Sequence, residues 1–72
     1  MYNVYPQYAR GGVGDMLTMV DSRMEAEEFA KDYFMINSRG STNALWVQNE
    51  DPTGPDYLMH KRGRSGVKVE AL

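Results

Sequence analysis

One helical pattern over residues 22–37 restricts the fold most, because the rest of the chain is typical of short strands and turns. Glu25 follows Ser22 by three residues, which predicts a capping box where each side chain accepts from the other residue's backbone N–H. Apolar residues then recur at helical spacing: Ala26, Phe29, Ala30, Tyr33 and Ile36. This stripe predicts a buried face, and residues 37–40 predict the end of the helix.

Short apolar segments lie on both sides of this helix. The predicted strands cover residues 2–8, 16–20, 43–49, 57–61 and 67–70, with turns at 11–14, 51–56 and 62–66. Pro6 cannot donate to a strand ladder, so it indicates an edge strand or a bulge. Because short connections favour antiparallel neighbours, we predict an α+β fold of order ββαβββ. A small antiparallel sheet of about five short strands, arranged as a meander, packs one face on the amphipathic helix.

The length and composition favour one cytoplasmic domain over residues 1–72. The chain has 72 residues, no cysteine and a single histidine, which excludes disulfides and argues against a structural zinc site. We therefore expect no metal and no cofactor. No apolar run approaches the ~20 residues that cross a bilayer, and the first residues lack the features of a signal peptide. We expect no membrane association.

The net charge of −2 is distributed unevenly along the chain. Residues 1–59 hold four basic and nine acidic side chains, whereas the last thirteen residues carry a balance of +3. The candidate contacts for nucleic acid or an acidic partner are His60, Lys61, Arg62, Arg64 and Lys68. Tyr57 or Trp46 could stack on a base beside them. The alternative interpretation is a solvated hairpin whose charges protect an edge strand.

A second candidate surface consists of apolar residues outside the helical stripe. Met24 and Met35 project from the outer side of the helix, and Phe34 lies at the border of the stripe. Methionine suits adaptable binding surfaces, and tyrosine is enriched at interfaces. Tyr2 and Tyr5 fall on opposite faces of the first strand, so at least one of them could face a partner. Single exposed apolar residues are also normal in a monomer.

Catalysis has little support in the sequence, and we expect no enzyme activity. There is no cysteine nucleophile, His60 is the single candidate base for the serines, and Ser22 is already explained as a helix cap. The glycine-rich turn at residues 11–14 lacks the Lys-Ser/Thr and the following helix of a phosphate-binding loop.

The leading functional hypothesis is a small non-enzymatic protein-binding module that acts as a regulator or inhibitor. In size and compactness the chain is similar to the small stand-alone proteins of bacteriophages and mobile elements, a resemblance that implies binding to a host protein. The alternative is a nucleic-acid-binding domain that uses the basic 60–68 hairpin. A third interpretation is a homodimer that buries the extra apolar surface.

Overall fold

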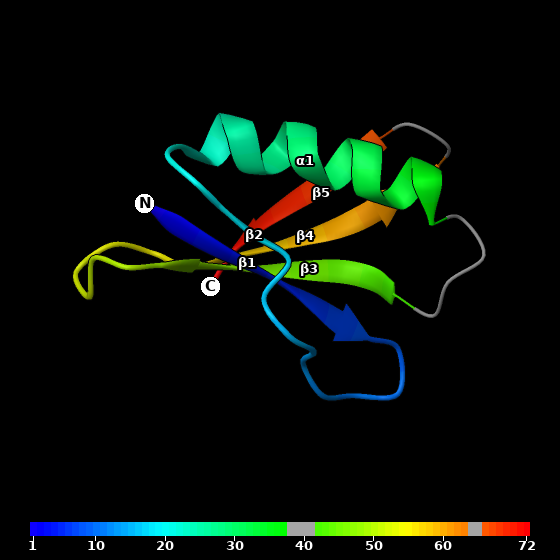
Figure 1. Cartoon of the computed structure of the whole chain (residues 1–72), viewed down its shortest axis with the longest axis horizontal. Coiled ribbons are helices and arrows are strands. Elements are labelled where there is room, and N and C mark those ends of the chain that lie inside the picture. The colour runs from blue at the N-terminus through cyan, green and yellow to red at the C-terminus, as the bar shows by residue number, and fades with distance from the viewer. Residues whose placement is uncertain (38–41, 64–65) are drawn as a thin grey trace.

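The computed structural model describes residues 1–37, 42–63 and 66–72. The predicted order ββαβββ is confirmed, and the element bounds agree closely with the sequence pattern. The elements are β1 (Tyr2–Tyr8), β2 (Thr18–Val20), α1 (Arg23–Ile36), β3 (Thr42–Asn49), β4 (Tyr57–Arg62) and β5 (Gly66–Ala71). The helix lies across one face of the sheet (Figure 1).

The five strands form one antiparallel sheet in the order β2-β1-β3-β4-β5. The predicted α+β class is therefore confirmed, but the predicted meander is wrong at one place. β1 lies between β2 and β3, so the connection from β2 through α1 crosses over β1 before the chain re-enters the sheet. The long pairing of β1 with β3, which spans Tyr2–Tyr8 and Thr42–Asn49, joins the two halves of the chain.

The helix begins at the predicted cap and faces the sheet with a slightly different stripe. The Glu25 N–H donates to Ser22 Oγ at 3.1 Å, which is one half of the predicted capping box. Asn37 forms the C-cap, where its backbone N–H donates to the Tyr33 carbonyl. Three helix residues are buried: Ala26, Ala30 and Phe34. Two predictions are therefore wrong, because Phe34 is in the core and Ile36 is 81% exposed.

The rotation of the stripe follows from helix geometry. A step of four residues turns about 40° beyond a full circle, whereas a step of three falls about 60° short of one. The buried residues are spaced by four, so Ile36 lies about 120° around the helix axis from Ala30. Phe29 and Tyr33 lie between Ala30 and Ile36 around the helix axis, and they are partly buried against the core.

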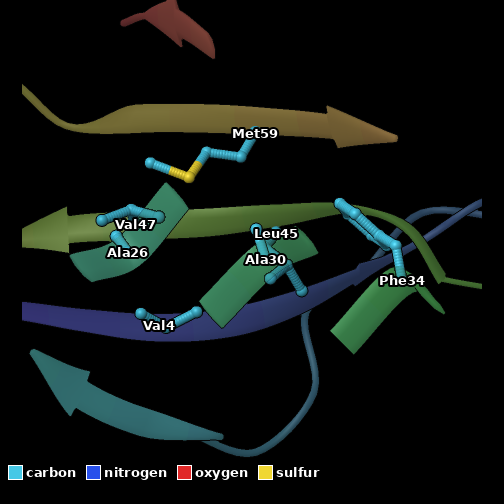
Figure 2. Packing of buried hydrophobic residues seen from close by; sticks show 7 residues of the cluster. All are labelled: Val4, Ala26, Ala30, Phe34, Leu45, Val47 and Met59. Carbon is cyan, nitrogen blue, oxygen red and sulfur yellow. The ribbon is translucent and has the colours of Figure 1, made fainter. Parts of the chain in front are cut away.

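The core occupies the space between α1 and the sheet (Figure 2). The largest fully buried side chains all come from strands: Val4, Leu45, Val47 and Met59. Each contributes about 1.5–3 kcal/mol relative to an exposed position. Ala26 and Ala30 present small side chains to this layer and are themselves fully buried.

Pro6 is accommodated in a strand that has neighbours on both sides. Its carbonyl accepts from the Gly14 N–H at 2.9 Å, so the edge of Pro6 that lacks an N–H faces away from β3. The ladder with β2 extends only over Tyr2–Val4, so no regular β2 bond is lost. A register shift lies next to it, where Gln7 pairs with Ala44 and Tyr8 with Thr42, so the extra residue is on β3 and not at Pro6.

Candidate functional site

The face of the sheet opposite α1 carries its own row of apolar side chains. Directly paired residues share one face, and the register pairs Tyr5 with Trp46 and Trp46 with Leu58. The alternate residues Val4 and Val47 pack under the helix. α1 is the one helix within residues 1–37, 42–63 and 66–72, so no second helical layer covers this side in that part of the chain. We call this side the open face.

An aromatic pair occupies the centre of the open face. The Tyr5 and Trp46 rings lie 5.3 Å apart between centroids and are tilted by 31°. The Tyr5 hydroxyl donates to Gln48 Oε1 at 3.4 Å, which links the pair to a neighbouring amide. Both rings are half-buried. Their mutual contact and strand anchoring hold a rigid aromatic patch on the two central strands.

The predicted basic cluster divides between the two sides of the β4–β5 hairpin. His60 pairs with Lys68 on the open face, and Arg62 shares their strand parity. Lys61 has the opposite parity and belongs to the helix side. His60 Nε2 lies 3.7 Å from Glu70 Oε1, so an acidic group sits within this cluster. Arg64 lies outside the described residues.

The predicted partner-binding residues do not come together. Phe34 is buried in the core, and Tyr2 contacts Tyr57 on the helix side with ring centroids 6.1 Å apart. Tyr5 is on the open face. Met24 and Met35 are 70% and 57% exposed, but they are eleven positions apart on the helix, a rise of about 16 Å. These five residues do not form a single surface, because the helix and the strand that carry them turn their side chains to different sides of the molecule. The spacing within one helix and one strand does not reveal that arrangement.

A denser apolar strip lies along the outer edge of the sheet, at β2 and the segment that precedes it. Ten large apolar residues are exposed in the described part of the chain, and four of them fall within residues 13–19: Val13, Met16, Leu17 and Met19. The bridge between Gln7 and Val13 and the bond from the Leu17 N–H to the Val4 carbonyl hold this segment along β1. Figure 2 shows β2 beyond β1 at the margin of the sheet. We call Val13, Met16, Leu17 and Met19 the edge strip.

The edge strip is connected to the open face. Met19 pairs with Asn3, which has the same strand parity as Tyr5, so the Met19 side chain lies on the open face. Val20, with the opposite parity, packs on the core under the helix. The sequence pattern alone indicated a short strand over residues 16–20. The feature that pointed to this strip was the absence of charge over residues 16–20, which local pattern analysis treats as a sign of burial.

The described residues contain no group of three or more His, Asp or Glu side chains that could hold a metal ion. None of the helices in that same part of the chain is long and apolar enough to span a membrane. Neither a family model, nor a curated protein, nor a solved structure matches this chain.

Proposed function

We propose that this protein is a small non-enzymatic protein-binding module, a regulator or inhibitor that recognises its partner through the edge strip and the adjoining open face. The observation that carries the proposal is the concentration of exposed apolar side chains in residues 13–19. Contiguous exposed apolar surface marks interaction sites, whereas scattered apolar residues are ordinary. Met24 and Met35 belong to the second kind.

The arrangement also supplies what interfaces need beside apolar area. Tyr5 and Trp46 form a preordered aromatic patch that loses little side-chain freedom on binding. Amide side chains of Gln48 and Asn3 lie across from one another on the same face and offer hydrogen-bonding groups around it. Aromatic residues are enriched at protein interfaces and carry much of the binding energy.

Affinity capture from a native lysate tests this proposal. The wild-type chain should retain a discrete partner that the double variant Leu17→Lys/Met19→Lys loses. The matched control is Met24→Lys/Met35→Lys, which introduces the same charges at exposed methionines of α1 and should retain the partner. Retention of no protein, or equal retention by both variants, contradicts the proposal.

A second candidate function, binding of single-stranded nucleic acid, rests on a separate observation. Tyr5 and Trp46 share the open face with Lys68 and Arg62. Glu70 lies on the same face beside His60, whereas the acidic side chains of α1 lie on the opposite side of the sheet. Aromatic residues stack on bases, and lysine and arginine neutralise phosphates.

Fluorescence anisotropy with a labelled oligothymidine, titrated against salt, tests this candidate. Binding should weaken as salt rises, and Trp46→Ala should lose about 1–3 kcal/mol of binding free energy while Trp46→Phe keeps most of it. Absence of binding at low salt excludes this candidate.

A further inference from the structure

The two edges of the sheet differ in how they are protected against pairing with another strand. β5 carries Lys68 and Glu70 at one edge. Charged side chains are a common means of keeping an edge strand from pairing with another chain. At the opposite edge, residues 16–20 carry no charge, and three of the five are exposed apolar residues. The β2 edge therefore lacks the protection that β5 has.

The backbone at β2 leaves hydrogen-bonding groups on its outer side. In an antiparallel ladder, the N–H and C=O of successive residues point to alternate sides. The carbonyls of Val4 and Pro6 accept bonds from the β2 side, so Asn3 directs its groups to β3 instead. Met19, which lies opposite Asn3, therefore directs its own N–H and C=O outward. Its carbonyl receives a long contact of 3.4 Å from the Thr18 hydroxyl.

Two carboxylates bracket this uncharged segment. Asp15 precedes it and Asp21 follows it, and both side chains are exposed. Within the described ranges the ion pairs are Arg23–Glu27 and His60–Glu70, so neither aspartate is neutralised there. Asp15 and Asp21 are six positions apart in the sequence, and the chain bends at both of them, outside the three strand residues of β2. A strand added at this edge meets negative charge at both of its ends.

The same charges disfavour a second copy of this chain as the occupant. A second copy paired at this edge brings its own Asp15 and Asp21 to the same strand pair, and residues 15–21 contain no basic side chain to offset them. Like charges gathered along a strand pair destabilise it. A segment with basic residues at both ends instead gains from both contacts.

We propose that the outer edge of β2 accepts an extended segment of another protein as an added strand. That segment carries Lys or Arg at two positions about six residues apart, on either side of an apolar and β-branched stretch. The added strand bonds to the outward groups at Met19, and its side chains contact the edge strip. This inference rests on the proposed protein-binding function and specifies the class of partner.

Selection of random twelve-residue peptides displayed on phage against the immobilised protein tests the inference. The enriched peptides should carry basic residues that flank a β-branched stretch. In NMR titrations with these peptides, the backbone amide chemical shifts of the protein should change most at residues 15–21. Asp15→Lys/Asp21→Lys should weaken these peptides roughly 2- to 30-fold and select acidic flanks instead. The matched control Glu28→Lys/Asp32→Lys makes the same charge change on α1 and should leave binding unaltered.

Met19→Pro provides a test of the strand geometry itself. It removes the outward N–H, which β1 does not use, so the fold persists while peptide binding is lost. Enrichment of no peptide, binding that maps to Trp46 or α1, or indifference to the aspartate reversal overturns the inference. The proposed protein-binding function survives these results if affinity capture of the lysate partner is still lost in Leu17→Lys/Met19→Lys. That function fails on its own if the double variant captures the partner as well as the wild type does. Dimerisation of the wild-type chain through β2 also overturns the inference.

Discussion

At the scale of single residues, Phe34 and Ile36 have opposite environments although they are two positions apart on α1. Phe34 is 3% exposed and Ile36 is 81% exposed. Phe34→Ala should lower the free energy of unfolding by about 3–5 kcal/mol, because it leaves a cavity between α1 and the sheet. Ile36→Ala should change it by less than ~0.5 kcal/mol. Urea unfolding followed by circular dichroism measures both.

A loss of about 3–5 kcal/mol is a large fraction of the stability that a domain of this size has, so Phe34→Ala could unfold the chain. Phe34→Leu keeps part of the buried volume and should give an intermediate loss on a folded protein. Equal destabilisation by the alanine variants at positions 34 and 36 contradicts the orientation of α1.

These two residues also show what the sequence could specify at this scale. Both fit an apolar helical period, and the choice depends on whether the stripe is followed in steps of three or of four. The existence of the buried face and its alanines was predictable from spacing. Its exact centre depends on how α1 crosses the sheet, which is a tertiary property.

At the scale of elements, the turn between β3 and β4 is held by side chains from its own residues. Asp51 Oδ1 accepts from the Thr53 N–H at 2.9 Å and from the Thr53 hydroxyl at 2.8 Å. Asp56 Oδ1 accepts from the Asn49 N–H at 2.9 Å across the base of the turn. Asp51 accepts these bonds better when ionised, so the Thr53 backbone N–H and then its hydroxyl hold the pKa of Asp51 below its usual value.

A pH dependence of stability follows from this lowered pKa. A carboxyl group with a lower pKa in the folded state contributes stability that is fully present above its unfolded pKa of about 4. The contribution disappears as pH falls through the folded pKa. Asp51→Asn keeps the acceptor but removes the charge, so its unfolding free energy should fall less than that of the wild type below about pH 4. Urea midpoints over an acid pH series measure the difference.

Thr53→Val separates the two donors. It removes the hydroxyl but keeps the backbone N–H, so it should reduce the pH dependence that Asp51 contributes without abolishing it. If the unfolding free energies of the wild type and Asp51→Asn differ by the same amount at every pH, Asp51 does not contribute the pH dependence.

Element bounds were predictable because they depend on local chemistry, whereas strand order was not. Ser22 marks the helix start, and the proline- and glycine-rich residues 51–56 mark a turn from sequence alone. The pairing of Tyr5 with Trp46 joins residues from either side of α1, and no short-range pattern encodes it. The open face could therefore be assembled only after the β1–β3 register was known.

At the scale of the whole molecule, one helix covers one face of the sheet and leaves two kinds of exposed surface. The open face combines the aromatic pair with the basic residues of the β4–β5 hairpin. The edge strip is apolar and bounded by Asp15 and Asp21. A phosphate backbone is attracted to the basic part of the first surface and repelled at the second. The two candidate functions therefore share the open face and differ in whether they use the edge strip.

The charges of Asp15 and Asp21 also bear on whether the chain associates with itself. If their repulsion prevents pairing of two β2 strands, the wild-type chain should remain monomeric over a wide concentration range in sedimentation velocity. Asp15→Asn/Asp21→Asn should self-associate, because an uncharged edge then faces its own copy. Adding Met19→Pro to that variant should restore the monomer, since it removes the outward N–H that the pairing requires.

Glu28→Gln/Asp32→Asn is the matched control for this experiment, because it removes the same number of charges from exposed positions on α1. That variant should stay monomeric, which separates the local effect at β2 from a general loss of repulsion between molecules. A monomeric Asp15→Asn/Asp21→Asn variant, or one whose association survives Met19→Pro, would show that the carboxylates do not act at the strand edge. Self-association that appears when both aspartates are neutralised and disappears with Met19→Pro instead identifies β2 as an edge whose choice of partner is set by charge.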